Sequence, residues 1–196
     1  SIYAPRAEGQ LKALHEAYAS AAIAPSTVNL IEAHGTGTRV GDKIEVQALK
    51  KLFGDQQTAT CALGSVKSMI GHTKAAAGAA GLIKTVMALQ NRTLPPTLKA
   101  DEPDPDLDLG NSPFYLNTRS TPWFRSNNTP RRAGVSAFGF GGSNFHVVLE
   151  EYAAQQPEVA WDGSIEILGL AKKSRESLRK AFHQLKNDVA DCPSEL

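Results

Sequence analysis

The stretch EAHGTGTRVGD at residues 32–42 decides the fold of this chain. It follows the apolar run VNLIEA (28–33), which predicts a short buried strand. His34 therefore stands at the carboxyl end of a strand, the edge at which open α/β sheets place ligand sites. Thr36 and Thr38 offer hydroxyl groups to a polar ligand there. The motif is not a dinucleotide-binding loop, because its glycine spacing differs and no helix is expected to start inside it. A plain turn that contains an incidental histidine is the alternative interpretation.

A second junction, GSVKSMIGHTKAAAGAAG (64–81), has the same layout. The apolar run CALGSV (61–66) predicts a strand, and an alanine-rich helix is expected over residues 73–90. Lys67 and His72 lie between them. The dipole at a helix N-terminus disfavours a protonated imidazole, so we expect a neutral His72 that donates a hydrogen bond. A buried helix with a polar first turn would explain the alanines but not Lys67 together with His72.

The third motif, AFGFGGSNFHVV (137–148), joins two predicted strands, 132–138 and 144–151, through the turn GFGG. Its glycines permit a tight turn whose backbone N–H groups are suited to stabilising an oxyanion. An ordinary hairpin turn is the alternative interpretation. His146 lies in the alternating second strand and is interpreted as structural.

Two further helices complete a layered pattern. Apolar residues at helical spacing predict one over residues 5–23 and another over 42–53, and Gly54 ends the second. Residues 91–124 are rich in Pro, Asp and Asn and are expected to be mostly loop. The order of helices and strands predicts an α/β layered fold. The apolar positions are Leu11, Leu14, Tyr18 and Ala22 in the first helix and Ile44, Ala48 and Leu52 in the second.

The composition changes after Tyr152, which predicts a domain boundary. We assign residues 1–152 to one domain and 153–196 to a linker followed by one β–α unit. In that unit residues 164–171 are strand-like, and Ser174 is the predicted N-cap of an amphipathic helix. A single β–α unit is too small to fold alone, so we expect it to begin a larger subdomain.

Charge and composition exclude several classes of function. The chain has 21 basic and 20 acidic residues, a net charge of +1, which gives no field for binding nucleic acid or an anionic membrane. No apolar run reaches the roughly 18 residues that a membrane span needs. Cys61 and Cys192 imply no disulfide framework, which favours a reducing, cytoplasmic location. No metal-ligand spacing is present, and the acidic run DEPDPDLD (101–108) is interpreted as a solvated loop.

Two histidines, a lysine and an oxyanion turn suggest acyl chemistry, although no nucleophile is evident. Cys61 lies in an apolar strand and Cys192 in a polar tail, and the sequence has no G-x-S-x-G elbow. The nucleophile of such a reaction is therefore not identified by these residues.

The three motifs, taken in order, resemble the C-terminal half of a β-ketoacyl synthase, the condensing domain of type I polyketide and fatty acid synthases. The resemblance covers residues 1–152, and residues 153–196 are similar to the start of the linker subdomain between ketosynthase and acyltransferase. YAPRAEGQ (3–10) and SPFYLNTRSTPW (112–123) look most similar to iterative synthases of the polyunsaturated fatty acid or enediyne type. The resemblance implies the C-terminal half of a thiolase-like fold, with the alanine-rich helix as its buried central helix.

The resemblance implies an acyltransferase that carries out a decarboxylative Claisen condensation of an acyl thioester with malonyl-carrier protein. His34 and His72 match the histidines that assist decarboxylation and stabilise the enolate oxygen. Lys67 matches the lysine that organises His34 through a charge network. Glu45 matches the acid that pairs with that lysine.

Further site residues follow from the same resemblance. Thr36 and Thr38 match hydroxyls that contact the phosphopantetheine arm, and Phe140 matches a gating phenylalanine whose backbone N–H contributes to the oxyanion hole. No cofactor is implied beyond the phosphopantetheine of the carrier protein. The nucleophilic cysteine belongs to the family's N-terminal half, outside these residues, so we expect them to condense nothing alone. Gly81 stands where some family members carry a glutamate, so no structural cation site is expected.

The implied partners are the N-terminal half of the ketosynthase, an acyl carrier protein, a downstream acyltransferase and a second copy in a homodimer, with no nucleic acid and no membrane. Two other functions stay open. One is a decarboxylase or chain-length subunit that keeps the histidines without condensing. The other is a structural or carrier-docking piece, in which Arg131 and Arg132 would meet an acidic carrier protein. A solvated arginine pair is the simpler interpretation.

Overall fold

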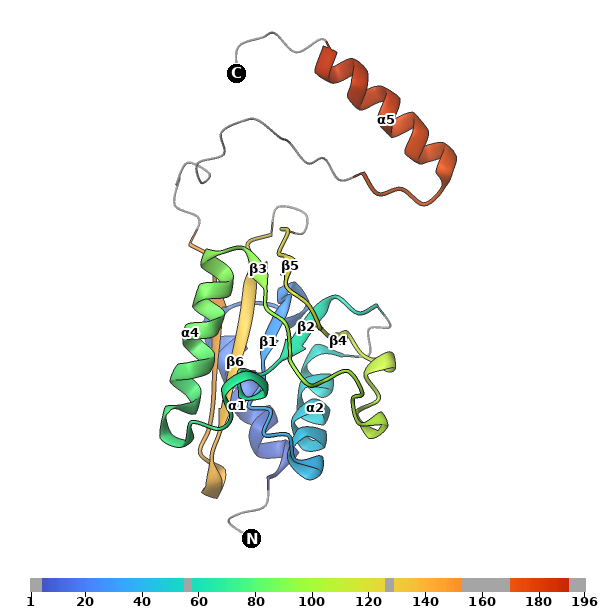
Figure 1. Ribbon diagram of the computed structural model, residues 1–196. Coiled ribbons are helices and arrows are strands. Elements are labelled where there is room, and N and C mark those ends of the chain that lie inside the picture. Colours follow the sequence, from blue (N-terminus) through green and yellow to red (C-terminus); the bar gives the residue numbers. More distant parts are fainter. Residues whose placement is uncertain (1–4, 55–57, 126–128, 153–169, 191–196) are drawn as a thin grey trace. The chain divides into compact units, whose positions relative to one another are not determined.

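A five-stranded mixed sheet lies at the centre of the first of two units, Ser1–Ala153 and Ala154–Leu196, into which the chain divides. The computed structural model describes residues 5–54, 58–125, 129–152 and 170–190. The strand order is β4-β2-β1-β6-β7, and neighbours are parallel except for β6 and β7 (Figure 1). The bounds are β1 Leu30–Glu32, β2 Cys61–Gly64, β4 Phe114–Leu116, β6 Arg132–Phe138 and β7 Asn144–Glu150.

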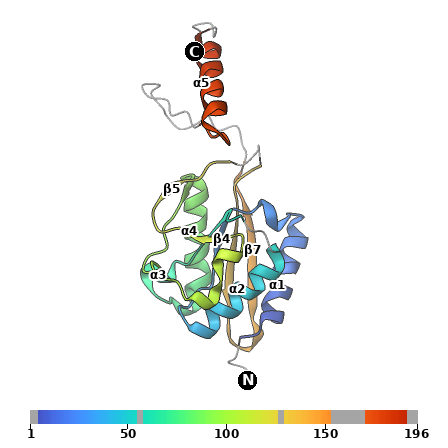
Figure 2. The ribbon, with the colours of Figure 1, turned by 90° about the vertical axis from the view of Figure 1, so that its right-hand side faces the viewer.

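Helices cover this sheet on both faces (Figure 2). α1 (Ala7–Ala21) and α2 (Arg39–Phe53) pack on one face and α4 (Ala77–Gln90) on the other. Parallel strands that are covered on both faces bury every side chain. The residues of β1 and β2 are accordingly apolar, apart from Glu32 at the end of β1. The predicted α/β layered fold is confirmed. One core contains Leu14, Tyr18, Ile31, Leu49, Phe53 and Phe114, and the other Leu30, Ala62, Ala88, Trp123 and Ala133.

Helix α2 begins inside the motif at 32–42, so the expectation that no helix starts there is wrong. It starts at Arg39, because the hydroxyl of Thr38 caps it by accepting a hydrogen bond from the N–H of Gly41 (3.2 Å). The threonine that the sequence offers as a ligand group therefore also has a structural role.

The buried face of α2 is wider than the predicted one. Ile44 and Leu52 are only half-buried. The helix packs against both the sheet and α1, so a broad apolar stripe is covered rather than a single row of side chains. The buried apolar residues of α2 are Val46, Ala48, Leu49 and Phe53.

Residues 91–124 contribute a strand to the main sheet, where the sequence predicted mostly loop. Strand β4 pairs in parallel with β2, with Phe114 opposite Cys61. β3 (Thr93–Leu94) and β5 (Thr121–Pro122) form a separate two-stranded sheet. These strands are short and lie in Pro-rich sequence, so their formation depends on partners distant along the chain.

The acidic run at 101–108 is mostly exposed, yet it is docked on α2 rather than freely solvated. Three ion pairs connect the run to basic residues of that helix. Because the pairs are exposed, each contributes little stability, and together they hold the loop in place. The pairs are Arg39–Asp104 (3.4 Å), Lys43–Asp106 (3.0 Å) and Lys50–Asp108 (3.0 Å).

Arg131 and Arg132 are both engaged inside the first unit, so the interpretation as a solvated pair is wrong. Arg131 is buried, pairs with Glu151 (2.6 Å) and donates to the carbonyl of Trp123. Arg132 pairs with Glu150 (2.6 Å). Both guanidinium groups are thus already paired within the first unit.

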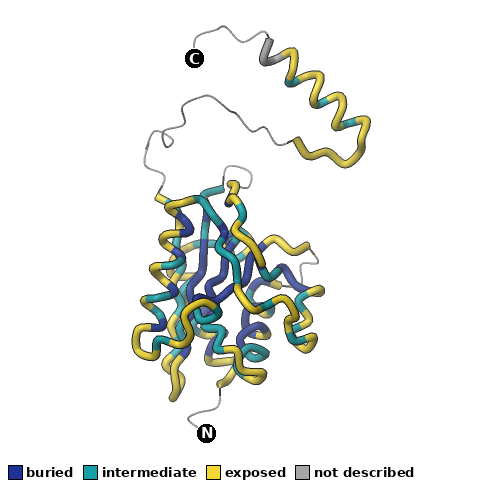
Figure 3. Tube along the Cα trace, viewed as in Figure 1, coloured by how far each residue is buried: buried dark blue, intermediate teal, exposed yellow. Residues whose placement is uncertain are grey.

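Helix α4 is buried on one face only (Figure 3). The predicted helix over 73–90 divides into the 3-10 turn η2 (Lys74–Ala76) and α4. Its outward apolar residues are exposed, Ile83 by 64%. An exposed apolar surface of this kind is typical of an interface, and no other described element of the first unit covers this side of α4. The exposed residues are Leu82, Ile83, Val86 and Met87.

The second unit is described over residues 170–190 only, and its helix is α5 (Arg175–Ala190). The hydroxyl of Ser174 accepts a hydrogen bond from the N–H of Ser177 (3.2 Å), which confirms the predicted cap. The predicted linker and most of the strand at 164–171 lie outside the described residues. No described helix has the length and apolar character to cross a membrane. The remaining short helices are η1 Pro25–Thr27, α3 Lys67–Ile70, η3 Pro105–Leu107, η4 Leu109–Asn111 and η5 Phe140–Gly142.

Substituting Gly134 of β6 with alanine is expected to destabilise the fold. A Cβ at Gly134 would lie 2.7 Å from Nε2 of His146 and 2.8 Å from Cδ1 of Ile31. Overpacking of this kind costs about 1–3 kcal/mol, measured as the free energy of unfolding in denaturant. Gly110→Ala is the matched control, because a Cβ there meets nothing within 4 Å. Equal stability of the two variants would contradict the packing described here.

Candidate active site

Three parallel strands end at one edge of the sheet, and each is followed by one of the three motifs. The last residue of β1 is level with the last residue of β2 and with Val135 of β6. His34 follows β1, Lys67 and His72 follow β2, and the turn at 139–143 follows β6. The parallel register therefore gathers groups that are far apart in the sequence.

The two predicted histidines meet at this edge. The ring centroids of His34 and His72 are 5.4 Å apart, and the rings are nearly perpendicular, at 83°. Phe138, the last residue of β6, also lies beside His34, with ring centroids 6.1 Å apart. Sequence analysis did not select Phe138, although its position at a strand end, directly before the glycine turn, was the available signal.

Glu45 fixes the backbone of the loop that carries His34. Its buried carboxylate, on α2, accepts hydrogen bonds from the N–H groups of His34 (2.8 Å) and Gly35 (2.9 Å). Gly35 has a φ of +45°, and a Cβ there would lie 2.7 Å from Cβ of Ser65, so glycine is required. Burial raises the pKa of Glu45 to about 7, and the two backbone N–H groups oppose this rise.

The ion pair predicted between Glu45 and Lys67 is not present between these two described side chains. Both oxygens of Glu45 are already occupied by backbone N–H groups. Lys67 is half-buried, which lowers its pKa, and the charges of Glu32 and Glu45 oppose this effect. Glu45 and Lys67 therefore influence each other through their charges, without a direct ion pair.

The surroundings of both imidazoles favour the neutral form, although His72 is exposed. Burial lowers the pKa of His34 to about 4, and Lys67 and His72 add to the shift. Desolvation and the charges of Lys67 and Lys74 also lower the pKa of His72. Nδ1 of His72 accepts a hydrogen bond from the N–H of Lys74 (3.0 Å), so the neutral ring carries its proton on Nε2. Nδ1 of His34 is buried and has no partner among the described residues.

One of the two predicted threonines lines a cleft beside the loop that follows β1. The cleft has a volume of about 520 Å³, and Thr36, Glu45 and Lys67 are among its lining residues. The hydroxyls of Thr36 and Thr38 are 3.0 Å apart, but Thr38 caps α2 and is not part of the lining. Thr36 is thus the threonine placed to meet a ligand in the cleft.

Phe140 lies on the turn that follows β6. Its side chain is 76% exposed. Gly141 and Gly142 have φ values of +73° and +86°, which glycine adopts without strain. The tight glycine turn is as the sequence predicted, and the oxyanion role of Phe140 stays a prediction.

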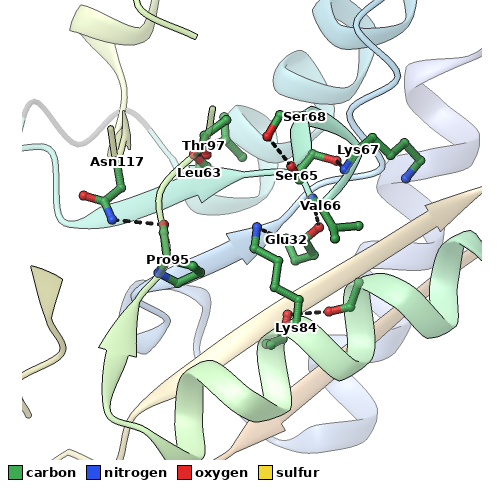
Figure 4. Close-up of polar contacts among 12 residues, drawn as sticks. Glu32, Leu63, Ser65, Val66, Lys67, Ser68, Lys84, Pro95, Thr97 and Asn117 are labelled. Atoms are coloured by element: carbon green, nitrogen blue, oxygen red, sulfur yellow. Dashed lines mark hydrogen bonds and ion pairs between the residues drawn. The ribbon is translucent and has the colours of Figure 1, made fainter. Parts of the chain in front are cut away.

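A buried ion pair that sequence analysis missed lies beneath this edge (Figure 4). Glu32, the last residue of β1, accepts hydrogen bonds from Nζ of Lys84 (2.7 Å) and from the N–H of Val66 (2.5 Å). Burial raises the pKa of Glu32, and the charge of Lys84 is the largest opposing influence. The signals in the sequence were a carboxylate inside an apolar strand and a lysine within an apolar helix.

Cys61 is not an activated nucleophile. It is a free, buried thiol in β2, and burial raises its pKa well above the ordinary value, which disfavours the thiolate. Within the described ranges, no group of three His, Cys, Asp or Glu side chains is arranged to hold a metal ion. Cys192 lies outside the described residues.

Solved structures of ketosynthases share this fold. The ketosynthase from module 6 of the bacillaene synthase of Bacillus subtilis 168 superposes with a TM-score of 0.74 and 37% identity, over 97% of this chain and 33% of that chain. An oxazolomycin ketosynthase domain from Streptomyces albus JA3453 gives a TM-score of 0.73 and 40% identity, over 78% of this chain and 28% of that chain. The predicted thiolase-like fold is therefore confirmed.

Family comparisons then identify the chain more closely. Residues 1–101 match the family described as beta-ketoacyl synthase, C-terminal domain, and residues 103–195 match the ketoacyl-synthetase C-terminal extension. The chain belongs to the β-ketoacyl synthase family, as the motifs predicted.

Curated relatives are much longer than this chain. One polyunsaturated fatty acid synthase polypeptide, from a Thraustochytrium species, is 51% identical over 157 residues, which is 76% of this chain and 6% of that protein. Polyketide synthase PksL of Bacillus subtilis is 44% identical over 159 residues, which is 80% of this chain and 3% of that protein. The chain thus spans a small part of the synthases that it matches.

The ring of His34 is expected to titrate near pH 4 in an NMR experiment, rather than near the ordinary value of 6.5. Because the folded-state pKa lies below the unfolded one, the stability from neutral His34 is present above about pH 6.5 and is lost as the pH falls toward 4. The spectrum of His34→Gln assigns the resonance. A titration midpoint near 6.5 would show that burial and Lys67 do not act on this ring.

Proposed function

We propose that this chain supplies half of a ketosynthase active site, which condenses an acyl thioester with malonyl-carrier protein in polyketide or fatty acid elongation. This assigns the protein to the acyltransferases of the β-ketoacyl-carrier protein synthase type. The observation that carries the proposal is the pair of neutral imidazoles, His34 and His72, with ring centroids 5.4 Å apart at one sheet edge. Relatives of this chain are named polyunsaturated fatty acid and polyketide synthases.

The two imidazoles suit the decarboxylation step. The bond between the malonyl carboxylate and C2 breaks, CO₂ leaves, and the electron pair passes to the thioester oxygen as an enolate. Neutral N–H donors fixed beside that oxygen stabilise the developing charge, and Nε2 of His72 carries such a proton. The enolate carbon then attacks the acyl thioester carbonyl, and the thiolate of a cysteine outside this chain leaves.

Lys67 and Glu45 prepare the histidines for this step. The positive charge of Lys67 disfavours protonation of both imidazoles, so each ring enters the reaction as a neutral donor. Glu45 holds the backbone at His34 through two hydrogen bonds. In this proposal Lys67 tunes the charge of the site and Glu45 sets its geometry.

Three residues are proposed to act on the substrate and its phosphopantetheine arm: Thr36, Thr38 and Phe140. Thr36 lines the cleft and is proposed to contact phosphopantetheine there, while the hydroxyl of Thr38, 3.0 Å from that of Thr36, is proposed to orient it. Phe140 is exposed on the turn that follows β6, a position that suits a gating side chain. Its backbone N–H is proposed to contribute to the oxyanion hole.

The proposal includes the partners that this chemistry needs. The N-terminal half of the ketosynthase would cover the apolar outer face of α4 and bring the nucleophilic cysteine, and without it this chain is proposed to be inactive. An acyl carrier protein would deliver substrates on phosphopantetheine, with no further cofactor. A downstream acyltransferase, a homodimer and a reducing cytoplasmic location complete the proposed setting.

Replacing either His34 or His72 with alanine is expected to lower malonyl decarboxylation by about 10²- to 10³-fold, because each removes a donor to the enolate oxygen. The measurement is CO₂ release from malonyl thioester by the longest native polypeptide that contains this chain. His15→Ala is the control, since His15 is exposed on α1. Unchanged decarboxylation in either site variant would refute the role given to that histidine, and with it the proposed function.

Acylation mapping tests the condensation itself. The same polypeptide is incubated with an acyl thioester, and the acylated peptide is identified by mass spectrometry. We expect the adduct on a cysteine outside this chain. Decarboxylation without any adduct would favour a non-condensing decarboxylase or chain-length subunit, and an adduct on Cys61 would overturn the site described here.

A further inference from the structure

The carboxylate of Glu32 touches the elements that carry the candidate site. Glu32 ends β1, two residues before His34. Its Oε1 accepts a hydrogen bond (2.5 Å) from the N–H of Val66, the residue before Lys67. Its Oε2 accepts a hydrogen bond (2.7 Å) from Nζ of Lys84 on α4. The strand, the loop and the central helix therefore meet at one side chain (Figure 4).

The surroundings leave room for this ion pair and shield it from water. Glu32 is 1% exposed, and the side chain of Lys84 is 11% exposed. A Cβ at Gly81 would lie 3.1 Å from Cγ of Glu32, so the glycine makes space for the carboxylate between α4 and the sheet. A well-packed apolar pair would stabilise a protein as well as a buried ion pair does. Stability alone therefore does not explain why a carboxylate stands at this position.

We propose that Glu32 is a positioning residue for decarboxylation. Its hydrogen bond to the N–H of Val66 fixes the loop that carries Lys67 relative to β1, and Lys84 neutralises its buried charge. This inference rests on the proposed function above. Val66 directly precedes the short helix α3, so a shift of its N–H moves Lys67 with it. A misplacement of about 1 Å in such a site costs about 10²-fold in rate.

Two double variants separate the hydrogen bond from the charges. Glu32→Gln with Lys84→Met removes both charges and keeps an amide oxygen that accepts from the N–H of Val66. Glu32→Met with Lys84→Met removes both charges and the acceptor. We expect the first to release CO₂ from malonyl thioester with a kcat close to that of the wild type. The second is expected to be about 10²-fold slower with a similar KM, and equal rates in the two variants would overturn the proposal.

Hydrogen exchange over residues 64–72 gives a readout that does not depend on activity. We expect the Val66 amide to exchange faster in the methionine double variant than in the glutamine one, because its acceptor is lost. Unchanged exchange would count against Glu32 as the group that holds the loop.

Val66→Pro removes the donor itself and keeps the proposal testable if the methionine variant does not fold. The φ of Val66 is −58°, which proline adopts. We expect this variant to lower kcat as the methionine variant does, and a wild-type kcat would overturn the proposal.

His34→Ala, measured alongside, separates this inference from the proposed function. If His34→Ala abolishes decarboxylation while both double variants retain it, only the positioning role of Glu32 fails. If His34→Ala decarboxylates like the wild type, the proposed function fails, and exchange of the Val66 amide then decides whether Glu32 holds the loop: faster exchange supports it and unchanged exchange overturns it.

Discussion

The two hydrogen bonds that the buried carboxylate of Glu45 accepts from the backbone of His34 and Gly35 are the constraint on which the site depends. A buried carboxylate that lost these donors would be costly, so helix α2 and the loop after β1 are bound to one geometry. The same helix starts at its Thr38 cap and is held by the acidic loop at 101–108. The position of the His34 imidazole thus depends on three segments: the loop after β1, helix α2 and the acidic loop at 101–108.

The protonation states of the side chains at this edge of the sheet depend on burial and on the positive charge of Lys67. Lys67 lies close enough to His34 and His72 to lower both of their pKa values, while Glu32 and Glu45 oppose the loss of its own charge. Two neutral rings and one ammonium therefore share the space where the parallel strands end. In the proposed function, a developing negative charge at this edge would meet the Nε2–H of His72, whose tautomer is set by the hydrogen bond from the N–H of Lys74.

The apolar outer face of α4 is exposed in this chain, which covers only part of the ketosynthases that it superposes on. The chain covers 33% of the bacillaene ketosynthase that it superposes on, and the helix that would be central in the complete fold is covered on one side here. Its inner side, with Gly81 and Thr85, packs on the sheet, while Ile83 and Met87 face outward. An apolar helix face of this kind is a surface suited to a second layer.

Sequence periodicity determined the layered fold and most helices, because helical and strand spacing are local properties of the chain. That His34, Lys67 and His72 belong to one site was implied by the resemblance to ketosynthases, not by periodicity. Tertiary structure decided the cap at Thr38, the strand at 114–116, the Glu32–Lys84 pair and the absence of a direct Glu45–Lys67 pair between those two described side chains. Each depends on which groups from distant segments compete for the same buried carboxylate or strand edge. That competition is settled by packing and desolvation, which no short stretch of residues encodes.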